Sequence, residues 1–327
     1  MYSFEQILQI VDGSVKKLHF EASPKSLFEP IEYILSLGGK RIRPAFMLMA
    51  CNLYKDSVDE AIIPALGMEV FHNFTLLHDD LMDEADVRRN RPTVHKKWGP
   101  NTAILSGDAM LIASYQLIGK TETHHLKDVL DTFSQTALEI CEGQQYDMEF
   151  ESRPVVAEAE YLEMIRLKTA VLLACCLKSG AIIGGASPED LNLLYQFGIH
   201  IGLLFQLQDD LLDVYGDPET FGKNIGGDIL CNKKTFLSIQ AMNKASDKQK
   251  DIIAYYQQKA DKDRLFLQEK IDAITSIYID LGIEEITKQK IQIYYDQAMC
   301  DLSRLSVGSE RLSALYEVAR KIMTRKS

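Results

Sequence analysis

The sequence lacks a basic excess and any Cys-x-x-Cys pair. Its 327 residues carry a net charge of −11, whereas nucleic-acid binders need basic surfaces that offset phosphate charge. Six cysteines are present, and Cys175 and Cys176 lie in an apolar run. We therefore expect reduced, mostly buried thiols and no nucleic-acid partner.

Long apolar runs and signal-peptide features are also missing from the sequence. No segment approaches the ~20 consecutive apolar residues that span a bilayer. The N-terminus, with Glu5 and Asp12, lacks the basic and apolar regions of a signal peptide. We therefore expect a cytoplasmic protein without an integral membrane segment.

No linker rich in Pro, Gly or Ser divides the chain, so residues 1–327 are predicted to form a single domain.

Strand patterns are absent too, because almost every segment has helical periodicity. From Leu66 to Asp83 apolar residues recur at helical spacing. Similar periodicity marks residues 103–119, 126–150, 160–184, 190–215, 234–243, 247–278 and 283–305. No alternating strand with a hairpin turn interrupts these segments. The sequence therefore predicts an all-α domain of about ten or more helices.

One acidic pattern, Asp-Asp-x-x-Asp, is present in two copies. They are Asp79, Asp80 and Asp83, and then Asp209, Asp210 and Asp213. Residues four apart share one face of a helix, so each copy offers three oxygen ligands near a helix end. Such ligands suit Mg²⁺ held together with substrate phosphates. One copy alone would be read as a solvated helix face, but two copies after apolar stretches favour a cage for cations and an anionic substrate.

Basic residues close to these motifs are candidates for binding the phosphates. Lys40, Arg41 and Arg43 follow Gly38-Gly39, and Pro44 suits a first helical turn. A helix N-terminus flanked by Lys and Arg is an anion site. Further candidates are residues 87–92, Lys168, Lys223, Lys233 and Lys234. A lone surface lysine would mean little, so it is the placement of these lysines around the acidic motifs that favours a phosphate site.

Taken together, these residues resemble the trans-type isoprenyl diphosphate synthases, which make geranyl, farnesyl, geranylgeranyl and longer diphosphates. The shared motifs follow the order of the family and are Gly38–Pro44, His78–Asp83 with Arg88-Arg89, Gly143-Gln144, Lys168-Thr169, Phe205–Asp213, and Gly222-Lys223 with Lys233. The resemblance implies an isoprenoid-synthase-type helical bundle around a central apolar cavity. It also implies a Mg²⁺-dependent head-to-tail condensation of isopentenyl diphosphate with an allylic diphosphate.

The resemblance also implies roles for single residues. The direct ligands of three Mg²⁺ ions would be Asp79, Asp83 and Asp209, while Asp80, Asp210 and Asp213 would complete the rims or hold metal-bound water. Contacts to the allylic diphosphate would come from Arg88, Lys168, Lys223 and Lys233. Contacts to isopentenyl diphosphate would come from Lys40, Arg43, His72 and Arg89. Thr169 and Gln206 match positions beside the reacting carbons, and the loop from Gly216 to Gly227 is expected to close the site.

One position departs from the family pattern, and others bear on product length. The family often has glycine before the lysine matched by Lys233, whereas this chain has Asn232. In the family the positions four and five before the first aspartate gate chain length, and here they are Thr75 and Phe74. A bulky residue at the second position resembles short-chain enzymes, so we expect an all-trans product of C15 to C20. Phe71, Met110 and Ser114 are further candidates for the cavity floor.

Several alternatives stay open or are disfavoured at this point. A longer-chain polyprenyl diphosphate synthase would share all the motifs. A non-catalytic subunit of a heteromeric prenyltransferase would be expected to lose aspartates or basic ligands, and both sets are intact. A terpene cyclase or squalene-type synthase would not need Lys40 and Arg43, and buried apolar helices would serve a diphosphate hydrolase poorly. Members of the family usually pair as homodimers, and the apolar helix from Ala103 to Ile118 is a candidate contact surface.

Overall fold

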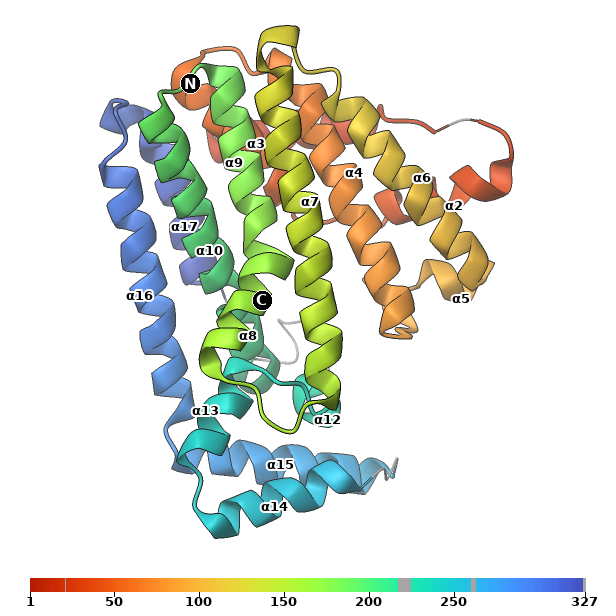
Figure 1. Cartoon of the computed structure of the whole chain (residues 1–327), viewed down its shortest axis with the longest axis vertical. Helices are drawn as coiled ribbons and strands as arrows, with labels where there is room; N and C mark the ends of the chain where they lie inside the picture. Colours follow the sequence, from red (N-terminus) through yellow and green to blue (C-terminus); the bar gives the residue numbers. More distant parts are fainter. Residues whose placement is uncertain (21, 217–224, 260–262, 326–327) are drawn as a thin grey trace. The chain divides into compact units, whose positions relative to one another are not determined.

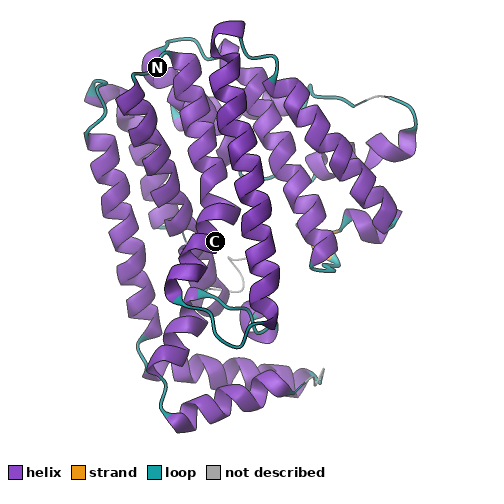
Figure 2. Ribbon diagram, in the orientation of Figure 1, coloured by secondary structure: helices purple, strands orange, loops and turns teal. Residues whose placement is uncertain are grey.

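The computed structural model describes residues 1–20, 22–216, 225–259 and 263–325, and nearly all of its regular structure is helical (Figure 1, Figure 2). Its internal contacts fall into two compact units. The first unit is Met1–Gln135, Cys175–Tyr195 and Leu305–Leu315, and the second is Thr136–Ala174, Gln196–Arg304 and Tyr316–Ser327. The predicted all-α class is confirmed. The single domain over residues 1–327 stays a prediction.

The helices can be followed along the chain by the colours of Figure 1. The first half contains α1 (Phe4–Val15), α2 (Lys25–Ser36), α3 (Ile42–Tyr54), α4 (Asp59–Met82), α5 (Val94–Trp98), α6 (Pro100–Ile118) and α7 (Thr123–Ser152). The second half contains α8 (Glu158–Ile165), the π-helical turn η1 (Arg166–Ala170), α9 (Val171–Gly184), α10 (Pro188–Tyr215), α12 (Gly227–Leu230), α13 (Phe236–Lys244), α14 (Asp247–Gln258), α15 (Arg264–Asp280), α16 (Ile283–Ser303), the 3₁₀ turn η2 (Ser309–Leu312) and α17 (Ser313–Met323).

Local sequence signals explain where several helices begin. Ser3 caps α1 and Ser246 caps α14, each in a reciprocal capping box with a glutamine three residues later. These boxes satisfy backbone N–H groups that a helix N-terminus leaves without a partner. Pro100 starts α6 at a position where its missing N–H costs nothing.

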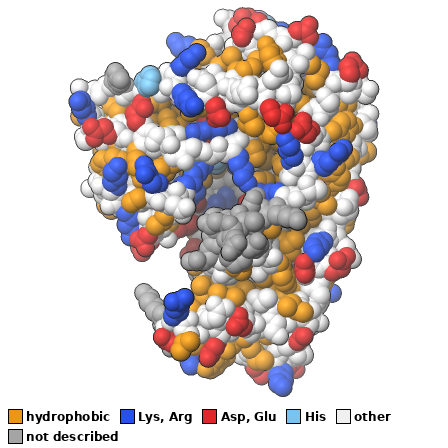
Figure 3. Space-filling model, turned by 180° about the vertical axis from the view of Figure 1, so that it is seen from behind, with side chains coloured by type: hydrophobic (Ala, Val, Ile, Leu, Met, Phe, Trp, Pro, Cys, Tyr) orange, Lys and Arg blue, Asp and Glu red, His pale blue; other side chains and the backbone are white. Residues whose placement is uncertain are grey.

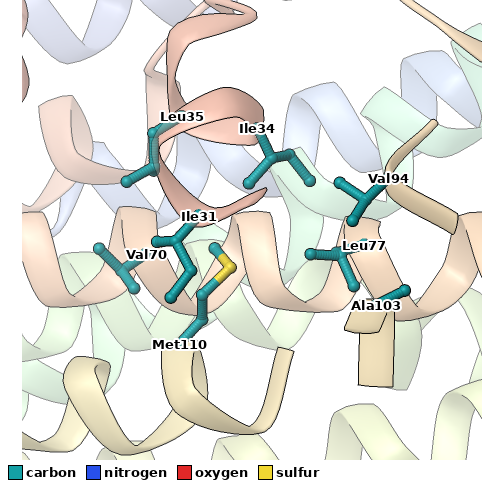
Figure 4. Close-up of a cluster of buried hydrophobic side chains, with 8 residues drawn as sticks. All are labelled: Ile31, Ile34, Leu35, Val70, Leu77, Val94, Ala103 and Met110. Carbon is teal, nitrogen blue, oxygen red and sulfur yellow. The ribbon is translucent and has the colours of Figure 1, made fainter. Parts of the chain in front are cut away.

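One hydrophobic core cluster of the first unit is built where α2, α4, α5 and α6 meet. Figure 4 shows the buried side chains that form it: Ile31, Ile34, Leu35, Val70, Leu77, Val94, Ala103 and Met110. Helices α4 and α6 pack closely along their length. The glycine at position 67 allows this approach, because a Cβ there would lie 2.7 Å from Cγ1 of Ile118. The end of α4 that carries the first aspartate motif is thus fixed by a packed core.

A two-stranded ladder corrects the expectation that strands are missing. Strands β1 (Val87–Arg88) and β2 (Arg91–Pro92) pair antiparallel directly after the first aspartate motif. The two residues between them, Arg89 and Asn90, have φ of 51° and 60°, as the tight turn of a two-residue hairpin requires. The ladder is too short for period-2 alternation, so the sequence pattern did not reveal it.

One helical stretch has the length and composition of a membrane span. The continuous stretch Glu158–Gly184 is long and apolar enough to cross a membrane by length and composition. Most of its apolar window is buried inside the structure, as expected for a core helix of a globular protein. Among the described residues no other helix passes the same test.

Candidate active site

The first aspartate motif lies at the C-terminal end of α4. The helix ends at Met82, and Asp83 is its cap and is exposed to solvent. Asp79 is partly exposed, whereas Asp80 is only 3% exposed. A helix C-terminus carries partial negative charge, so carboxylates gathered there favour a bound cation. The predicted position of the motif at a helix end is confirmed.

Arg88 in β1 reaches back to the first motif. Its Nε donates to both carboxylate oxygens of Asp80, at 2.9 and 2.8 Å, and its Nη2 lies 3.8 Å from Oδ2 of Asp79. Burial raises the pKa of Asp80, and the charge of Arg88 opposes that shift. The hairpin therefore delivers one positive charge to two aspartates.

Arg89, in the turn of the hairpin, reaches the glycine pair before α3. Its Nη1 donates to the carbonyl oxygen of Gly38. Gly39 has a φ of 144°, and a Cβ there would lie 3.0 Å from Nη2 of Arg89, so glycine permits both the backbone conformation and the approach. Burial lowers the pKa of Arg89, as do the nearby charges of Arg41 and Arg88. The structure thus brings Arg89 to the loop that carries Lys40.

Arg43 and His72 meet beside this loop, as the resemblance implies. Nη1 of Arg43 lies 3.0 Å from Nε2 of His72. Burial, followed by the charges of Arg43 and Arg89, lowers the pKa of His72 well below its usual value. Nε of Arg43 is buried and has no hydrogen-bond partner among the described residues. An anion here would therefore meet a neutral imidazole and an arginine with an unused donor.

Arg41, named from the sequence as a candidate phosphate ligand, is instead paired with a buried acid, and two residues of this cluster, Glu69 and Asn73, were not singled out by the sequence. Arg41 is 7% exposed and has a left-handed backbone with φ of 48°. Its guanidinium donates to Glu69, at 2.5 Å, and to the carbonyl of Leu35, at 2.8 Å. Asn73 also donates to Glu69, at 2.9 Å. The available signal was Glu69 itself, a single acid in an apolar stretch three residues before His72.

The residues predicted to limit product length form an aromatic cluster in the first unit. The ring centroid of Phe71 lies 5.5 Å from that of Phe74 and 5.0 Å from that of Phe133. The Phe74 ring also packs edge-on against His78, at 4.8 Å. Thr75 donates its hydroxyl to the carbonyl of His72, at 2.8 Å. Phe133 of α7 was missed because nothing in its local sequence relates it to α4.

The second aspartate motif occupies the last turns of α10 in the second unit. Its middle residue, Asp210, is 3% exposed. It accepts hydrogen bonds from the hydroxyl of Tyr161 and from Nε2 of Gln206, the latter at 3.2 Å. Burial, aided by the charge of Asp228, raises the pKa of Asp210 to about 7. In the part of the chain that the structure describes, the side chains that donate to this carboxyl group are therefore neutral.

A π-helical turn presents Lys168 and Thr169 to the same region. Such turns bulge out of a regular helix and often occur at functional sites. Nζ of Lys168 lies 2.6 Å from Oδ2 of Asp147, and the hydroxyl of Thr169 donates to Oε1 of Gln206, at 3.2 Å. Gly143 of α7 permits the approach, because a Cβ there would lie 2.4 Å from the backbone nitrogen of Lys168. The predicted neighbours Lys168, Thr169 and Gln206 are thus brought together.

These side chains line a cavity of about 110 Å³ in the second unit. Its wall contains both carboxyl groups and basic residues, among them Asp147, Lys168, Gln206, Asp210, Asp228 and Lys233. Asp147, Tyr161 and Asp228 were not singled out from the sequence, since isolated acids and tyrosines carry no motif. The face drawn in Figure 3 likewise carries both basic and acidic side chains. In a protein with a net charge of −11, a phosphate site would need a local group of Lys and Arg.

The two outer aspartates of the second motif already have partners. Asp213 accepts a hydrogen bond from the backbone N–H of Asp228, at 3.0 Å, at the start of α12. Asp209 forms an ion pair with Arg325, whose guanidinium carbon lies 4.2 Å from the ring centroid of Phe205. Burial lowers the pKa of Arg325 to about 10. Lys223 and residues 217–224 of the expected closing loop lie outside the described residues.

The aspartates of both motifs fit Mg²⁺ as a partner. Their carboxylates are the hard oxygen ligands that this ion prefers, and one of them, Asp209, already forms an ion pair with a cation of the chain, Arg325. In the part of the chain that the structure describes, no three His, Cys, Asp or Glu side chains are gathered so as to hold an ion by themselves. Substrate phosphates would therefore supply part of the coordination.

Comparison with known proteins relates this arrangement to one family. Residues 24–273 match the family model of polyprenyl synthetase. A geranylgeranyl diphosphate synthase of Methanosarcina mazei is 41% identical over 236 residues, which cover 72% of this chain and 73% of that protein. A geranylfarnesyl diphosphate synthase of Natronomonas pharaonis is 37% identical over 257 residues, covering 73% and 75%.

Solved structures lead to the same family. A crystal structure of a geranylgeranyl pyrophosphate synthase superposes with a TM-score of 0.95 at 41% sequence identity, and the match covers 100% of both chains. The family model spans more than half of this sequence and the relatives are well above 30% identical. The chain therefore belongs to the polyprenyl synthetase family.

Proposed function

We propose that this protein condenses isopentenyl diphosphate with an allylic diphosphate in a Mg²⁺-dependent reaction that releases pyrophosphate. As a polyprenyl synthetase it is a prenyltransferase. The observation that carries the proposal is the cavity of the second unit, where Lys168, Thr169 and Gln206 share a wall with Asp210. A phosphate-binding lysine beside uncharged dipoles suits a leaving anion and a carbocation.

Divalent ions are required by the charges of the proposed substrate. At an effective dielectric near 20, two like unit charges about 5 Å apart repel by roughly 3 kcal/mol. Six aspartates therefore cannot face a diphosphate unless cations lie between them. When bound, Mg²⁺ stabilises the developing charge of the departing pyrophosphate. We propose three ions, with Asp79, Asp83 and Asp209 as direct ligands and Asp80, Asp210 and Asp213 around them.

The chain's own cations complete the binding of the allylic substrate. Arg88, Lys168 and Lys233 would contact its diphosphate, and Lys223 would add a further contact from outside the described residues. Arg88 is already held by Asp80, and Lys168 is held by Asp147, so both are oriented before substrate arrives. Such preorganised charges stabilise the leaving group without reorganisation at the moment of bond cleavage.

Isopentenyl diphosphate would bind to the basic site of the first unit, at Lys40, Arg43, His72 and Arg89. A neutral His72 suits this role, because an imidazole N–H can donate to phosphate oxygen without adding repulsion to Arg43. The buried Nε of Arg43 has a donor left for an anion. This site needs no metal, since the arginines and Lys40 already supply the positive charge.

The reacting carbon atoms would lie against Thr169 and Gln206. The hydroxyl of Thr169 donates to Gln206, which leaves the lone pairs of its oxygen able to stabilise an allylic cation. The double bond of isopentenyl diphosphate would attack this cation, and the proton lost would pass to the released pyrophosphate. Water must be excluded because it would capture the cation.

The product is proposed to be an all-trans chain of C15 to C20. The support is the bulk of Phe74 and Phe71 beneath the first aspartate motif, backed by Phe133. A relative named geranylgeranyl diphosphate synthase agrees with the C20 end of this range, whereas one named geranylfarnesyl diphosphate synthase, a C25 product, corresponds to the longer-chain alternative. Replacement of Phe74 by Ala should lengthen the product, and an unchanged chain-length distribution would assign the floor to another residue.

We also propose that the protein acts as a homodimer in the cytoplasm. Helix α6 exposes Ile104, Leu105 and Ile112 at 44%, 59% and 61%, an apolar face of the kind that marks protein interfaces. Leu105→Glu should shift the mass measured by sedimentation equilibrium toward that of the monomer. A mass equal to that of the unchanged protein would exclude this face of α6 as the dimer interface.

Product analysis tests the proposed reaction. The full-length protein is incubated with Mg²⁺, isopentenyl diphosphate and dimethylallyl, geranyl or farnesyl diphosphate in turn, and the products are separated by chain length. We expect condensation with at least one starter and none with EDTA present. Failure to condense any of the three starters would refute the synthase proposal and leave the non-catalytic subunit as the alternative.

A further inference from the structure

The segment from Gly226 to Ser238, which carries Lys233 and Lys234, lies between two cavities of the second unit and is called the wall below. Asp228, Lys233 and Thr235 line both the cavity of about 110 Å³ and a smaller one of about 30 Å³. Lys168 and Gln206 line only the larger cavity, whereas Asn232 and Lys270 line only the smaller. A contact made to this wall from the smaller cavity therefore also affects the positions of the lysines that face the larger cavity.

Both ends of the wall are anchored to neighbouring helices. At its start, the carbonyl and carboxylate of Asp213 accept from the N–H groups of Gly226 and Asp228, at 2.6 and 3.0 Å. At its end, Thr235 caps α13, and the hydroxyl of Ser238 donates to the carbonyl of Lys233, at 3.1 Å. The middle of the wall is the turn from Leu230 to Lys233.

Asn232 gives this turn an unusual backbone. Its φ is 55°, a left-handed value that favours glycine and that Asn tolerates better than most other residues. Its N–H donates to the carbonyl of Ile229, at 3.2 Å, and the next N–H, of Lys233, donates to the carbonyl of Asp228, at 2.9 Å. The direction in which Lys233 leaves the turn therefore depends on this one left-handed residue.

Lys270 of α15 holds the turn from the side of the smaller cavity. It is 4% exposed, and its Nζ donates to Oδ1 of Asn232, at 2.7 Å, and to the carbonyl of Leu230, at 3.0 Å. Both acceptors are uncharged. Burying an ammonium group is costly unless its hydrogen bonds are made, so each bond matters to the lysine as well as to the turn. Burial lowers the pKa of Lys270, in agreement with this cost.

We propose that Lys270 and Asn232 form a positioning clamp that directs Lys233 toward the diphosphate of the allylic substrate. The clamp joins two residues 38 positions apart in the sequence. Asn232 supplies both the left-handed turn and the acceptor, whereas glycine would supply only the turn. Neither residue touches the substrate, so both act through Lys233, and the inference rests on the proposed diphosphate role of that lysine.

The clamp predicts a selective loss of affinity for one substrate. Lys270→Met removes the ammonium group at nearly constant volume and frees the turn. We expect the KM for the allylic diphosphate to rise about tenfold, which corresponds to the loss of one charge-assisted hydrogen bond. The Kd of a non-reactive allylic thiolodiphosphate, measured with Mg²⁺, should rise by the same factor. The KM for isopentenyl diphosphate should stay within about twofold, because its proposed site lies in other residues. Asn232→Gly should give a smaller rise of the same kind, since it keeps the backbone conformation.

A double-mutant cycle with Lys233→Met tests whether the clamp acts through that lysine. If it does, adding Lys270→Met to Lys233→Met should change the Kd by less than about twofold. An undiminished tenfold effect in the double variant would overturn the proposal. Lys288→Met is the matched control, because Lys288 lies on the surface of α16 in a pair with Glu284, and it should leave every constant unchanged.

Hydrogen exchange separates failure of the clamp from failure of the proposed function. The amides of Asn232 and Lys233 should exchange at least about tenfold faster in Lys270→Met and in Asn232→Gly, but not in Lys288→Met. Unchanged exchange in folded Lys270→Met protein would refute the clamp. If Lys233→Met alone left the Kd unchanged while exchange still rose, the diphosphate role of Lys233 would be wrong and the clamp would be only structural. Should Lys270→Met fail to fold, Asn232→Gly and its cycle with Lys233→Met decide the same points.

Discussion

The two aspartate motifs share a sequence pattern but differ in the chemistry that surrounds them. Asp80 and Asp210, the middle residues, are both 3% exposed. Asp80 is held by the guanidinium of Arg88, whereas Asp210 is held by the hydroxyl of Tyr161 and the amide of Gln206. The same five-residue pattern can therefore bury a carboxylate with a cation or a carboxyl group with neutral donors.

The outer residues of the motifs differ as well. In the first motif Asp83 is an exposed cap of α4. In the second motif Asp213 accepts the backbone N–H of Asp228, and Asp209 is paired with Arg325. The second motif thus takes part in the local structure of its unit, and a metal ion would have to compete with a cation of the chain itself. Four predictions test this difference.

The largest expected effect is on turnover. Asp79→Ala and Asp209→Ala each remove a proposed metal ligand, and the loss of transition-state stabilisation should lower kcat by about 10²–10³-fold or more. Steady-state kinetics in saturating Mg²⁺ with circular dichroism as a folding check provides the measurement. Asp131→Ala, at an exposed residue of α7, is the control. A near-normal rate in either variant would show that the metal ligands are wrongly assigned for that motif.

The second prediction concerns pH and the metal-free protein. The pKa of Asp210 is raised from 3.8 to about 7, so the folded state binds its proton more tightly than the unfolded state. The contribution of Asp210 to stability is thus greatest below about pH 4 and is lost as pH rises to about 7, by at most about 4 kcal/mol. In Asp210→Asn the free energy of unfolding should decrease less over this pH range. Urea unfolding with EDTA at pH 4.5, 6 and 7.5 measures it. A variant whose decline is as steep as that of the unchanged protein would contradict the raised pKa.

The third prediction compares the partners of the two buried carboxyl groups. Arg88→Met leaves Asp80 buried without its cation and should lower the free energy of unfolding by about 3 kcal/mol. Tyr161→Phe removes one neutral donor and should cost about 1–2 kcal/mol. Urea unfolding at pH 7.5 without Mg²⁺ measures both. Equal costs would mean that the two environments differ less than their hydrogen bonds indicate.

The sequence was sufficient for the fold class, and it pointed to several residues that the structure brings close together, whose roles stay predictions. Helical periodicity located α4 and α10, and spacing placed each aspartate motif at a helix end, where the structure has it. Lys168, Thr169 and Gln206 were matched by resemblance and lie together. Signals of this kind are local or carried by a motif, so they can be read before folding.

What the sequence did not reveal depends on contacts between distant segments. Glu69, Asp147 and Tyr161 gain their roles only because folding brings Arg41, Lys168 and Asp210 to them. The β1–β2 ladder was missed because two-residue strands have no periodicity. Asn232 was noted only as a departure from a glycine, and its role needs a left-handed φ and a lysine 38 residues away.

The smallest expected effect concerns Arg325 and the competition of the chain with Mg²⁺. Because its guanidinium pairs with Asp209, a metal ion at this carboxylate must displace it. Arg325→Ala should therefore tighten the binding of Mn²⁺, a spectroscopic substitute for Mg²⁺, by about twofold to fivefold, the worth of a partly exposed ion pair. Electron paramagnetic resonance titration of the substrate-free protein measures this change. Arg320→Ala removes an exposed arginine of α17 and serves as the control. Weaker Mn²⁺ binding in Arg325→Ala would show instead that Arg325 supports the site, and unchanged binding would show that the ion does not use Asp209 before substrate arrives.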